Sequence, residues 1–197
     1  MMNVFGALRE RWNTRTGATR RMWNREYASG FGGLLETPEN REHYLMLTDF
    51  LVEAGKNKRI LDVCCGQGLL LDFIERCGYA KYVGFDFSEV ALASASRRAN
   101  AKASFVHGQA ESFVPEGRFD SIVFNECLYC FADPLRVLQR FEGYLAPEGV
   151  MAVSLFTKTE RIKAIAADIA KNFKVVRKAS VTNATGTWEC SLISPGE

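Results

Sequence analysis

The chain has 197 residues, of which 47% are hydrophobic and 24% charged, and its formal net charge is +2. These values fit one globular domain with a full apolar core, and the small net charge gives no overall field that would demand a nucleic acid or an anionic membrane. We find no apolar run of bilayer length and no secretory signal in residues 1–25. Because the six cysteines are scattered along the chain, we expect a reducing, cytoplasmic setting.

The N-terminal part, residues 1–55, is expected to form a helical cap segment ahead of a main domain over residues 56–197. Residues 1–25 carry six arginines against one glutamate. This composition fits a solvated, partly helical lead segment, and it also fits an arm that binds an acidic partner or RNA. The sequence leaves both interpretations open.

Within this cap, Trp23, Tyr27 and Phe31 are spaced four residues apart, which is the spacing of one helical face. Residues 39–54 predict a further helix. One face of that helix carries Tyr44, Leu47, Phe50 and Leu51. Three glycines before it are expected to break regular structure: Gly30, Gly32 and Gly33.

From residue 59 onward, short β-rich runs alternate with helical patterns. Candidate strands cover residues 59–65, 82–87, 104–107, 121–125, 149–156, 174–181 and 188–193. Candidate helices cover residues 69–77, 88–100, 134–145 and 159–172. The last two strands are joined by too few residues for a crossover helix, so they must pair as a hairpin. We therefore predict an α/β fold with a Rossmann-like, doubly wound, mostly parallel seven-stranded sheet and a C-terminal antiparallel hairpin strand.

A glycine turn after the first predicted strand carries the strongest chemical signal. Gly66 and Gly68 end an apolar strand and precede a helix, where glycines let the backbone approach a ligand that faces free N–H groups. The next strand ends in Asp86, and a carboxylate at that distance suits a ribose diol. The third glycine of a dinucleotide fingerprint is replaced by Leu71. The pattern thus indicates an adenosine-containing ligand without a pyrophosphate.

The segment Leu-Asp-Val-Cys-Cys-Gly-Gln-Gly at residues 61–68 resembles motif I of class I S-adenosylmethionine-dependent methyltransferases. Further stretches resemble the later motifs of that family, in order: residues 84–88 followed by Ala91 and Leu92, residues 108–111, residues 119–123 and residues 145–150. The overall pattern is most similar to the small-molecule type, including the N-methyltransferases of bacterial nodulation-factor synthesis. The resemblance implies S-adenosylmethionine as cofactor, S-adenosylhomocysteine as product, and no metal.

On the methionine side of the cofactor, the resemblance implies contacts with the turn at Cys64, Gly66 and Gly68. Asp62 is then expected to orient the turn or the cofactor's amino group, and Tyr27 to touch its carboxylate. The first glycine of the usual turn is Cys64 here. A small side chain fits that position if its backbone keeps a negative φ.

On the adenosine side, the resemblance implies that Asp86 binds both ribose hydroxyls and that Phe87 flanks the adenine. Ala110 is expected to meet the ring through its N–H group. Gln109 replaces the usual aspartate, and its carbonyl can still accept a hydrogen bond from the adenine amine. Asn125 is expected to border the methionine moiety and the methyl group.

The acceptor side is less clearly specified. Residues 125–131 contain neither an Asn-Pro-Pro-Tyr nor an Asp-Pro-Pro-Tyr run nor the histidine base of many O-methyltransferases. Glu126 and Tyr129 are the candidates to accept or orient a proton, although Glu126 also fits a backbone or cap contact and Tyr129 also fits plain packing. Cys127 and Cys130 form half of a zinc pattern without a second half, so no metal is expected.

We therefore predict methyl transfer from S-adenosylmethionine to an N or O atom of a small-molecule acceptor, without a membrane partner. Two alternatives stay open. One is an RNA or tRNA methyltransferase that uses the arginine-rich N-terminus. The other is a non-catalytic, cofactor-binding partner subunit, and the sequence leaves the oligomeric state undetermined.

Overall fold

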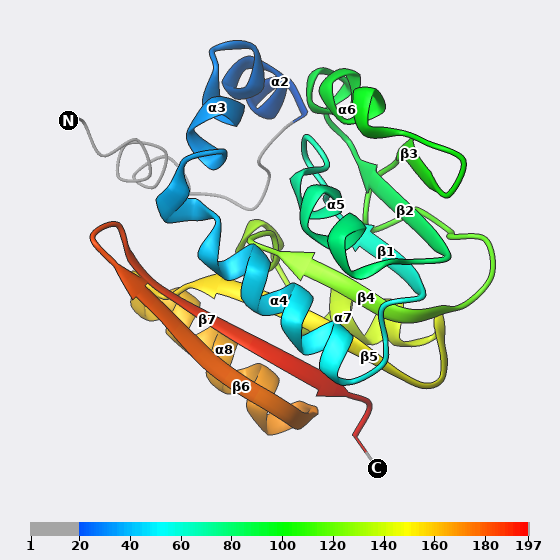
Figure 1. Ribbon diagram of the computed structural model, residues 1–197. Coiled ribbons are helices and arrows are strands. Elements are labelled where there is room, and N and C mark those ends of the chain that lie inside the picture. The colour runs from blue at the N-terminus through cyan, green and yellow to red at the C-terminus, as the bar shows by residue number, and fades with distance from the viewer. Residues whose placement is uncertain (1–19, 197) are drawn as a thin grey trace.

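A seven-stranded sheet forms the middle layer of the computed structural model, which describes residues 20–196 (Figure 1). Its strands are β1 (Arg59–Val63), β2 (Lys81–Asp86), β3 (Ala103–His107), β4 (Phe119–Asn125), β5 (Leu145–Phe156), β6 (Lys174–Asn183) and β7 (Gly186–Ser194). They lie in the order β3-β2-β1-β4-β5-β7-β6. Strands β1 to β5 run parallel to one another, whereas β7 is antiparallel to both β5 and β6. This arrangement confirms the predicted fold class, including the C-terminal hairpin.

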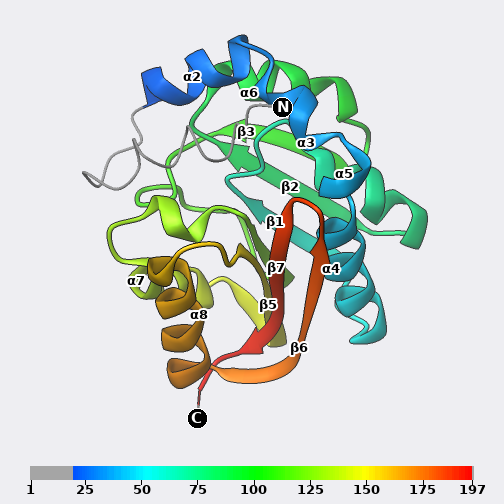
Figure 2. The ribbon, with the colours of Figure 1, turned by 90° about the vertical axis from the view of Figure 1, so that its left-hand side faces the viewer.

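Helices cover both faces of the sheet. They are α2 (Arg20–Ala28), α3 (Phe31–Leu35), α4 (Glu42–Glu53), α5 (Leu69–Ile74), α6 (Glu89–Ala95), α7 (Pro134–Glu142) and α8 (Glu160–Asn172), with short 3-10 turns η1 (Pro38–Asn40), η2 (Glu75–Cys77), η3 (Ser96–Arg98) and η4 (Leu128–Cys130). Figure 2 shows α4 and α5 on one side of the sheet and α7 and α8 on the other. The result is a three-layer structure with the parallel strands buried in its middle.

Two apolar cores lie on the two faces of the sheet, and successive residues of a strand contribute their side chains to one core and then to the other. In β1, Ile60 belongs to the core under α4 and α5, while Leu61 and Val63 belong to the core under α7 and α8. The four residues predicted on one face of α4 are all buried. Helix α4 packs on β5 and β7 and so forms part of a helical layer that covers the sheet. The predicted boundary at residue 55, between a cap segment and a main domain, stays a prediction.

Local signals in the sequence placed several helix ends correctly. The Ser88 hydroxyl accepts a hydrogen bond from the Ala91 N–H at the start of α6, and Asp133 caps α7 in the same way. The predicted helix over residues 134–145 ends earlier, at Glu142, because β5 already begins at Leu145.

The predicted glycine break is correct at one of its three positions. Gly30 has a φ of +92° and separates α2 from α3. Gly32 and Gly33 were expected to break regular structure, but they lie inside α3. At Gly32 the missing β-carbon instead lets the helix pack directly against the Gln67 side chain.

Candidate functional site

A cavity of about 460 Å³ lies at the carboxyl ends of β1, β2 and β4, where the turns that follow these strands meet the α2–α3 segment. Ligand sites of doubly wound sheets are found at this edge. Of the predicted site residues, all but one line this cavity: Tyr27, Asp62, Cys64, Gly66, Asp86, Phe87, Gln109, Ala110, Asn125, Glu126 and Tyr129. The exception is Gly68, which does not contribute to the wall.

The turn after β1 needs glycine at two positions. Gly66 and Gly68 have φ values of +54° and +74°. A β-carbon at Gly66 would stand 2.6 Å from the Tyr27 hydroxyl, and one at Gly68 would stand 2.6 Å from the Phe105 ring. Gly68 therefore brings the start of α5 close to the sheet, while Gly66 makes room for the Tyr27 hydroxyl at the cavity wall.

Cys64 contradicts one expectation. Its φ is +57°, not the negative value that we expected of a residue replacing the first glycine. The left-handed conformation costs a residue with a β-carbon roughly 1–2 kcal/mol, and such strain is often found at functional sites. The turn thus begins in a left-handed conformation even without glycine.

Asp86 connects the turns that follow β1 and β2. Its carboxylate accepts hydrogen bonds from the Gly66 N–H at 2.9 Å and from the Ser88 N–H at 2.8 Å. Burial raises the pKa of Asp86, and these N–H bonds oppose that rise. Because a carboxylate oxygen can accept more than one hydrogen bond, Asp86 keeps capacity for ligand hydroxyls.

Asp62 is a second buried carboxylate at the cavity. Its side chain accepts a hydrogen bond of 2.5 Å from the Tyr82 hydroxyl, and Asp62 as a whole is only 2% exposed. Burial raises the pKa of Asp62 to about 7, although the bond from Tyr82 opposes the rise. Near neutral pH this group is therefore divided between its neutral and charged forms.

Glu126 lies just after β4, with a φ of +55°. Its carboxylate accepts hydrogen bonds from the Ser154 hydroxyl at 3.0 Å, the Phe156 N–H at 3.1 Å and the Tyr129 hydroxyl at 3.2 Å. Burial raises the pKa of Glu126 to about 7 against the opposing effect of these donors. A carboxyl with this pKa can exchange a proton near neutral pH.

The β5 partners of Glu126 were missed by the sequence interpretation. Ser154 lies in an otherwise apolar strand and also contacts the Asn125 side chain at 2.5 Å. The available signal was a single serine within the apolar run of residues 150–156, and the structure shows that this serine is fully buried. A polar network therefore joins the end of β4 to β5.

The adenosine side of the predicted site is also assembled. Phe87, Gln109 and Ala110 all line the cavity. The main-chain carbonyl of Gln109 accepts hydrogen bonds from the N–H groups of Ser112 and Phe113, and these bonds form a turn after β3. The Gln109 side chain is exposed and Ala110 is buried.

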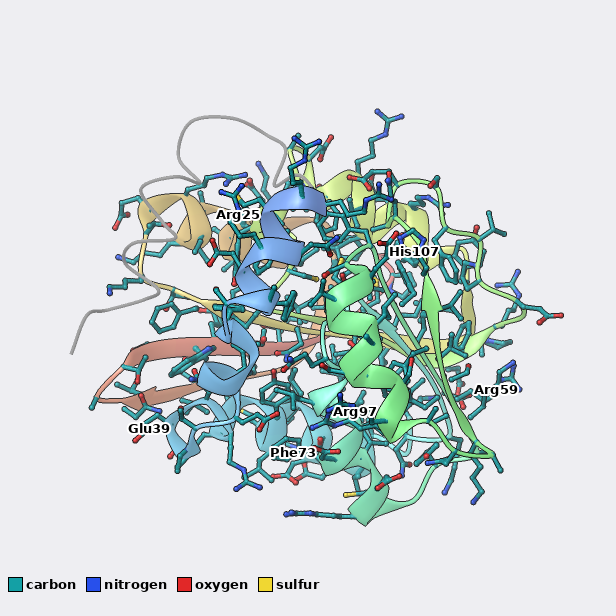
Figure 3. The ribbon with its side chains drawn as sticks, turned by 90° about the horizontal axis from the view of Figure 1, so that it is seen from above. Arg25, Glu39, Arg59, Phe73, Arg97 and His107 are labelled. Carbon is teal, nitrogen blue, oxygen red and sulfur yellow. The ribbon has the colours of Figure 1, made fainter. Side chains whose placement is uncertain are left out.

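The α2–α3 segment forms part of the cavity wall. The three predicted aromatic residues gather as expected, with ring centroids 5.7–5.8 Å apart, although Phe31 belongs to α3 and not to the same helix. Seen from above, α2 lies beside α6 (Figure 3). The Ser88 hydroxyl donates a hydrogen bond of 2.7 Å to the Asn24 side chain. Asn24 is thus a contact between the cap and the turn after β2 that the sequence did not reveal.

The structure over residues 20–196 can be searched for a metal site and for a membrane-spanning helix. In that range no three His, Cys, Asp or Glu side chains come together as a metal site. The same range contains no helix long and apolar enough to cross a bilayer. Arg9, Arg11 and Arg15 of the predicted arginine-rich arm lie outside the described residues.

A family model described as a methyltransferase domain matches residues 39–190. The chain belongs to this methyltransferase family. This chain is 35% identical to one curated relative, the ubiquinone biosynthesis O-methyltransferase of Dinoroseobacter shibae, over 115 residues, which are 56% of this chain and 46% of the relative. It is 34% identical to the ribosomal protein L11 methyltransferase of Caulobacter sp. over 140 residues, 68% of this chain and 48% of the relative. The chain spans about half the length of these relatives.

Several solved methyltransferase structures share the fold of this chain. The N-methyltransferase NodS from Bradyrhizobium japonicum WM9, in complex with S-adenosyl-L-homocysteine, matches with a TM-score of 0.78 and 18% identity over 92% of this chain and 100% of that one. The 1,6-didemethyltoxoflavin-N1-methyltransferase of Burkholderia thailandensis matches with a TM-score of 0.73 and 19% identity over 90% and 87%. The chain therefore has the same fold as these two methyltransferases.

Proposed function

We propose that the methyltransferase transfers the methyl group of S-adenosylmethionine to a nitrogen or oxygen atom of a small-molecule acceptor. The observation that carries this proposal is that Gly66, Asp86 and Glu126 border the same cavity. Its volume of about 460 Å³ lies in the range of small-molecule sites. The names of two similar proteins, a ubiquinone O-methyltransferase and a toxoflavin N1-methyltransferase, agree with a small acceptor.

The residues present fit the cofactor. Gly66 brings the main chain to the cavity wall without a side chain and in contact with the Tyr27 hydroxyl, and Asp86 keeps acceptor capacity for ribose hydroxyls. We propose that these two residues hold the cofactor together with the rest of the predicted set: Tyr27, Asp62, Cys64, Gly68, Phe87, Gln109, Ala110 and Asn125. When bound, the cofactor supplies a methyl group already activated on a sulfonium.

Glu126 is the group that we propose as proton acceptor. A nucleophilic hydroxyl or amine must lose a proton as it is methylated, and a base works best when its pKa lies near the operating pH. The raised pKa of Glu126, about 7, meets that condition. Tyr129 and Ser154 orient the carboxylate through their hydroxyl groups. The remaining contribution of the chain is to align donor and acceptor.

The two alternative functions gain no comparable support. The exposed residues Arg20, Arg21 and Arg25 extend the arginine-rich segment into α2, but exposed arginines alone do not specify RNA. A proton acceptor tuned to neutral pH favours an enzyme over a non-catalytic partner. We also propose a reducing, cytoplasmic setting, since all six cysteines are free thiols.

Calorimetry tests the cofactor assignment directly. The full chain is titrated with S-adenosylmethionine, S-adenosylhomocysteine and NAD. We expect micromolar binding of the two sulfur nucleosides, lost in Asp86→Ala and kept in Asp49→Ala, which removes an exposed carboxylate of α4. Transfer of labelled methyl to a panel of small acceptors then tests the reaction. Binding of NAD instead, or an unaffected Asp86→Ala variant, would overturn the proposal.

A further inference from the structure

Part of the cavity wall is aromatic and has no role in the predicted cofactor site. It consists of His43 and Tyr44 from α4 and Trp188 from β7. The His43 ring is stacked on Trp188, with centroids 5.2 Å apart and planes 9° apart, and its centroid lies 4.3 Å from that of Tyr44. Tyr44 and Trp188 also pack against Phe73 and Phe156, so the three rings form a fixed aromatic wall that a planar ligand can pack against.

His43 is unusual within this wall. It is only 3% exposed, and neither of its ring nitrogens has a hydrogen-bond partner among the described residues. Burial lowers the pKa of His43 to about 3, so the imidazole is neutral and offers one donor and one acceptor. Buried polar groups are nearly always paired. Because His43, unlike the equally unpaired Thr48, lines the cavity, a molecule bound there can supply the missing partner.

The charges around the cavity restrict what that molecule can be. Among the described lining residues, the acidic ones are Asp62, Asp86, Glu111 and Glu126. The one permanently cationic side chain is that of Arg20, which is 53% exposed and lies 3.7 Å from Glu89. An anionic acceptor would enter a low-dielectric space beside carboxylates, where the described lining offers no buried cationic side chain to pair with it.

We propose that His43 recognises the methyl acceptor, and that this acceptor is an uncharged ring compound bearing a hydroxyl group or a ring nitrogen. The ring lies against His43, Tyr44 and Trp188, and its polar group is hydrogen-bonded to the imidazole after a small rotation of the His43 ring. His43 acts here as a specificity residue, and Glu126 keeps the role of proton acceptor. This inference rests on the proposed function, because it places a small acceptor in the same cavity.

A matched pair of variants on α4 tests the inference. His43→Phe and Thr48→Val each remove buried polar atoms that have no partner, and Thr48 does not line the cavity. The full chain is assayed with S-adenosylmethionine on phenols, catechols and hydroxylated nitrogen heterocycles, beside their carboxylated and phosphorylated counterparts. We expect methylation of the uncharged compounds only. We further expect His43→Phe to raise the acceptor KM about tenfold or more, with partial recovery in His43→Gln.

Three controls separate recognition from structure. S-adenosylhomocysteine binding and the melting temperature should be as high in His43→Phe as in the wild type, and Thr48→Val should leave the acceptor KM unchanged. An unaffected acceptor KM in His43→Phe, or a preference for the anionic compounds, would overturn the inference. Failure of S-adenosylhomocysteine to bind the wild type would instead overturn the proposed function.

Nuclear magnetic resonance gives a readout of contact. The chain contains two histidines, His43 and His107, and His107 lies at the end of β3 (Figure 3). In protein labelled with nitrogen-15 histidine, saturated with S-adenosylhomocysteine, addition of the best acceptor should move the imidazole signals of His43 but not those of His107. His107→Gln assigns the two sets. Unmoved His43 signals at a saturating acceptor concentration would refute the contact.

Discussion

The hydroxyl oxygen of Tyr27 lies 2.6 Å from the point where a β-carbon on Gly66 would stand. The helix α2 and the turn after β1 are therefore in direct contact at the cavity, at a residue whose φ is +54°. Only glycine satisfies the conformation and the contact together. The cap segment and the glycine turn consequently depend on one another, although 38 positions separate the two residues.

Replacement of Gly66 by alanine should separate these two elements. We expect Gly66→Ala to weaken S-adenosylhomocysteine binding by about tenfold or more and to lower the unfolding free energy by roughly 1–2 kcal/mol, because the new methyl group meets Tyr27 in a left-handed residue. Calorimetry and urea denaturation measure the two effects. Gly33→Ala is the control, since its methyl group meets nothing within 4 Å inside α3. Binding by Gly66→Ala at wild-type strength would contradict the argument.

Ser88 should matter more for stability than its partner Asn24. The Ser88 hydroxyl both accepts from the Ala91 N–H as the N-cap of α6 and donates to Asn24, whereas Asn24→Ala removes the second bond alone. We expect Ser88→Ala to cost about 1 kcal/mol more than Asn24→Ala in urea denaturation, the usual contribution of an N-cap. Equal losses of stability in the two variants would show that the bond between Ser88 and Asn24 matters more than the N-cap of α6.

Glu126 should control the pH dependence of turnover. A proton acceptor must be ionised, so kcat/KM should rise as the pH increases through about 7, the pKa of Glu126, and level off above it. In Glu126→Gln this rise should vanish and the rate should fall by about a hundredfold or more. Tyr129→Phe removes a bond that lowers the pKa of Glu126, so the rise should move to higher pH. Glu116→Gln, at an exposed carboxylate, is the control.

Asp62 should make the protein less stable as the pH rises. Its pKa is 3.8 when unperturbed and about 7 in the folded chain, so between these values the folded state holds more protons than the unfolded state, and the free energy of unfolding falls with increasing pH. Below about pH 4 the penalty is absent, and above about pH 7 it is complete at roughly 4 kcal/mol. Asp62→Asn, without cofactor, should therefore be more stabilised relative to wild type at pH 8 than at pH 4. A pH-independent difference in urea denaturation would contradict this.

The sequence by itself determined the features that depend on neighbouring residues. The glycine turn, the caps at Ser88 and Asp133 and the short connection between β6 and β7 are set by local backbone conformation. Together with the alternation of strand and helix patterns they were sufficient to predict the sheet, whereas the cofactor residues were predicted from the resemblance to a family. The same local signals failed at Cys64, because its left-handed conformation is imposed by the turn and not by its own preference.

Only the tertiary structure decided the acceptor side of the cavity. His43 and Trp188 come from opposite ends of the chain, and Ser154 reaches Glu126 from a neighbouring strand. The raised pKa of Glu126 arises from burial, a property that no residue has before the chain is packed around it. Contacts between distant segments and the loss of water exist only in the folded molecule, and together they turn ordinary polar residues into a candidate site.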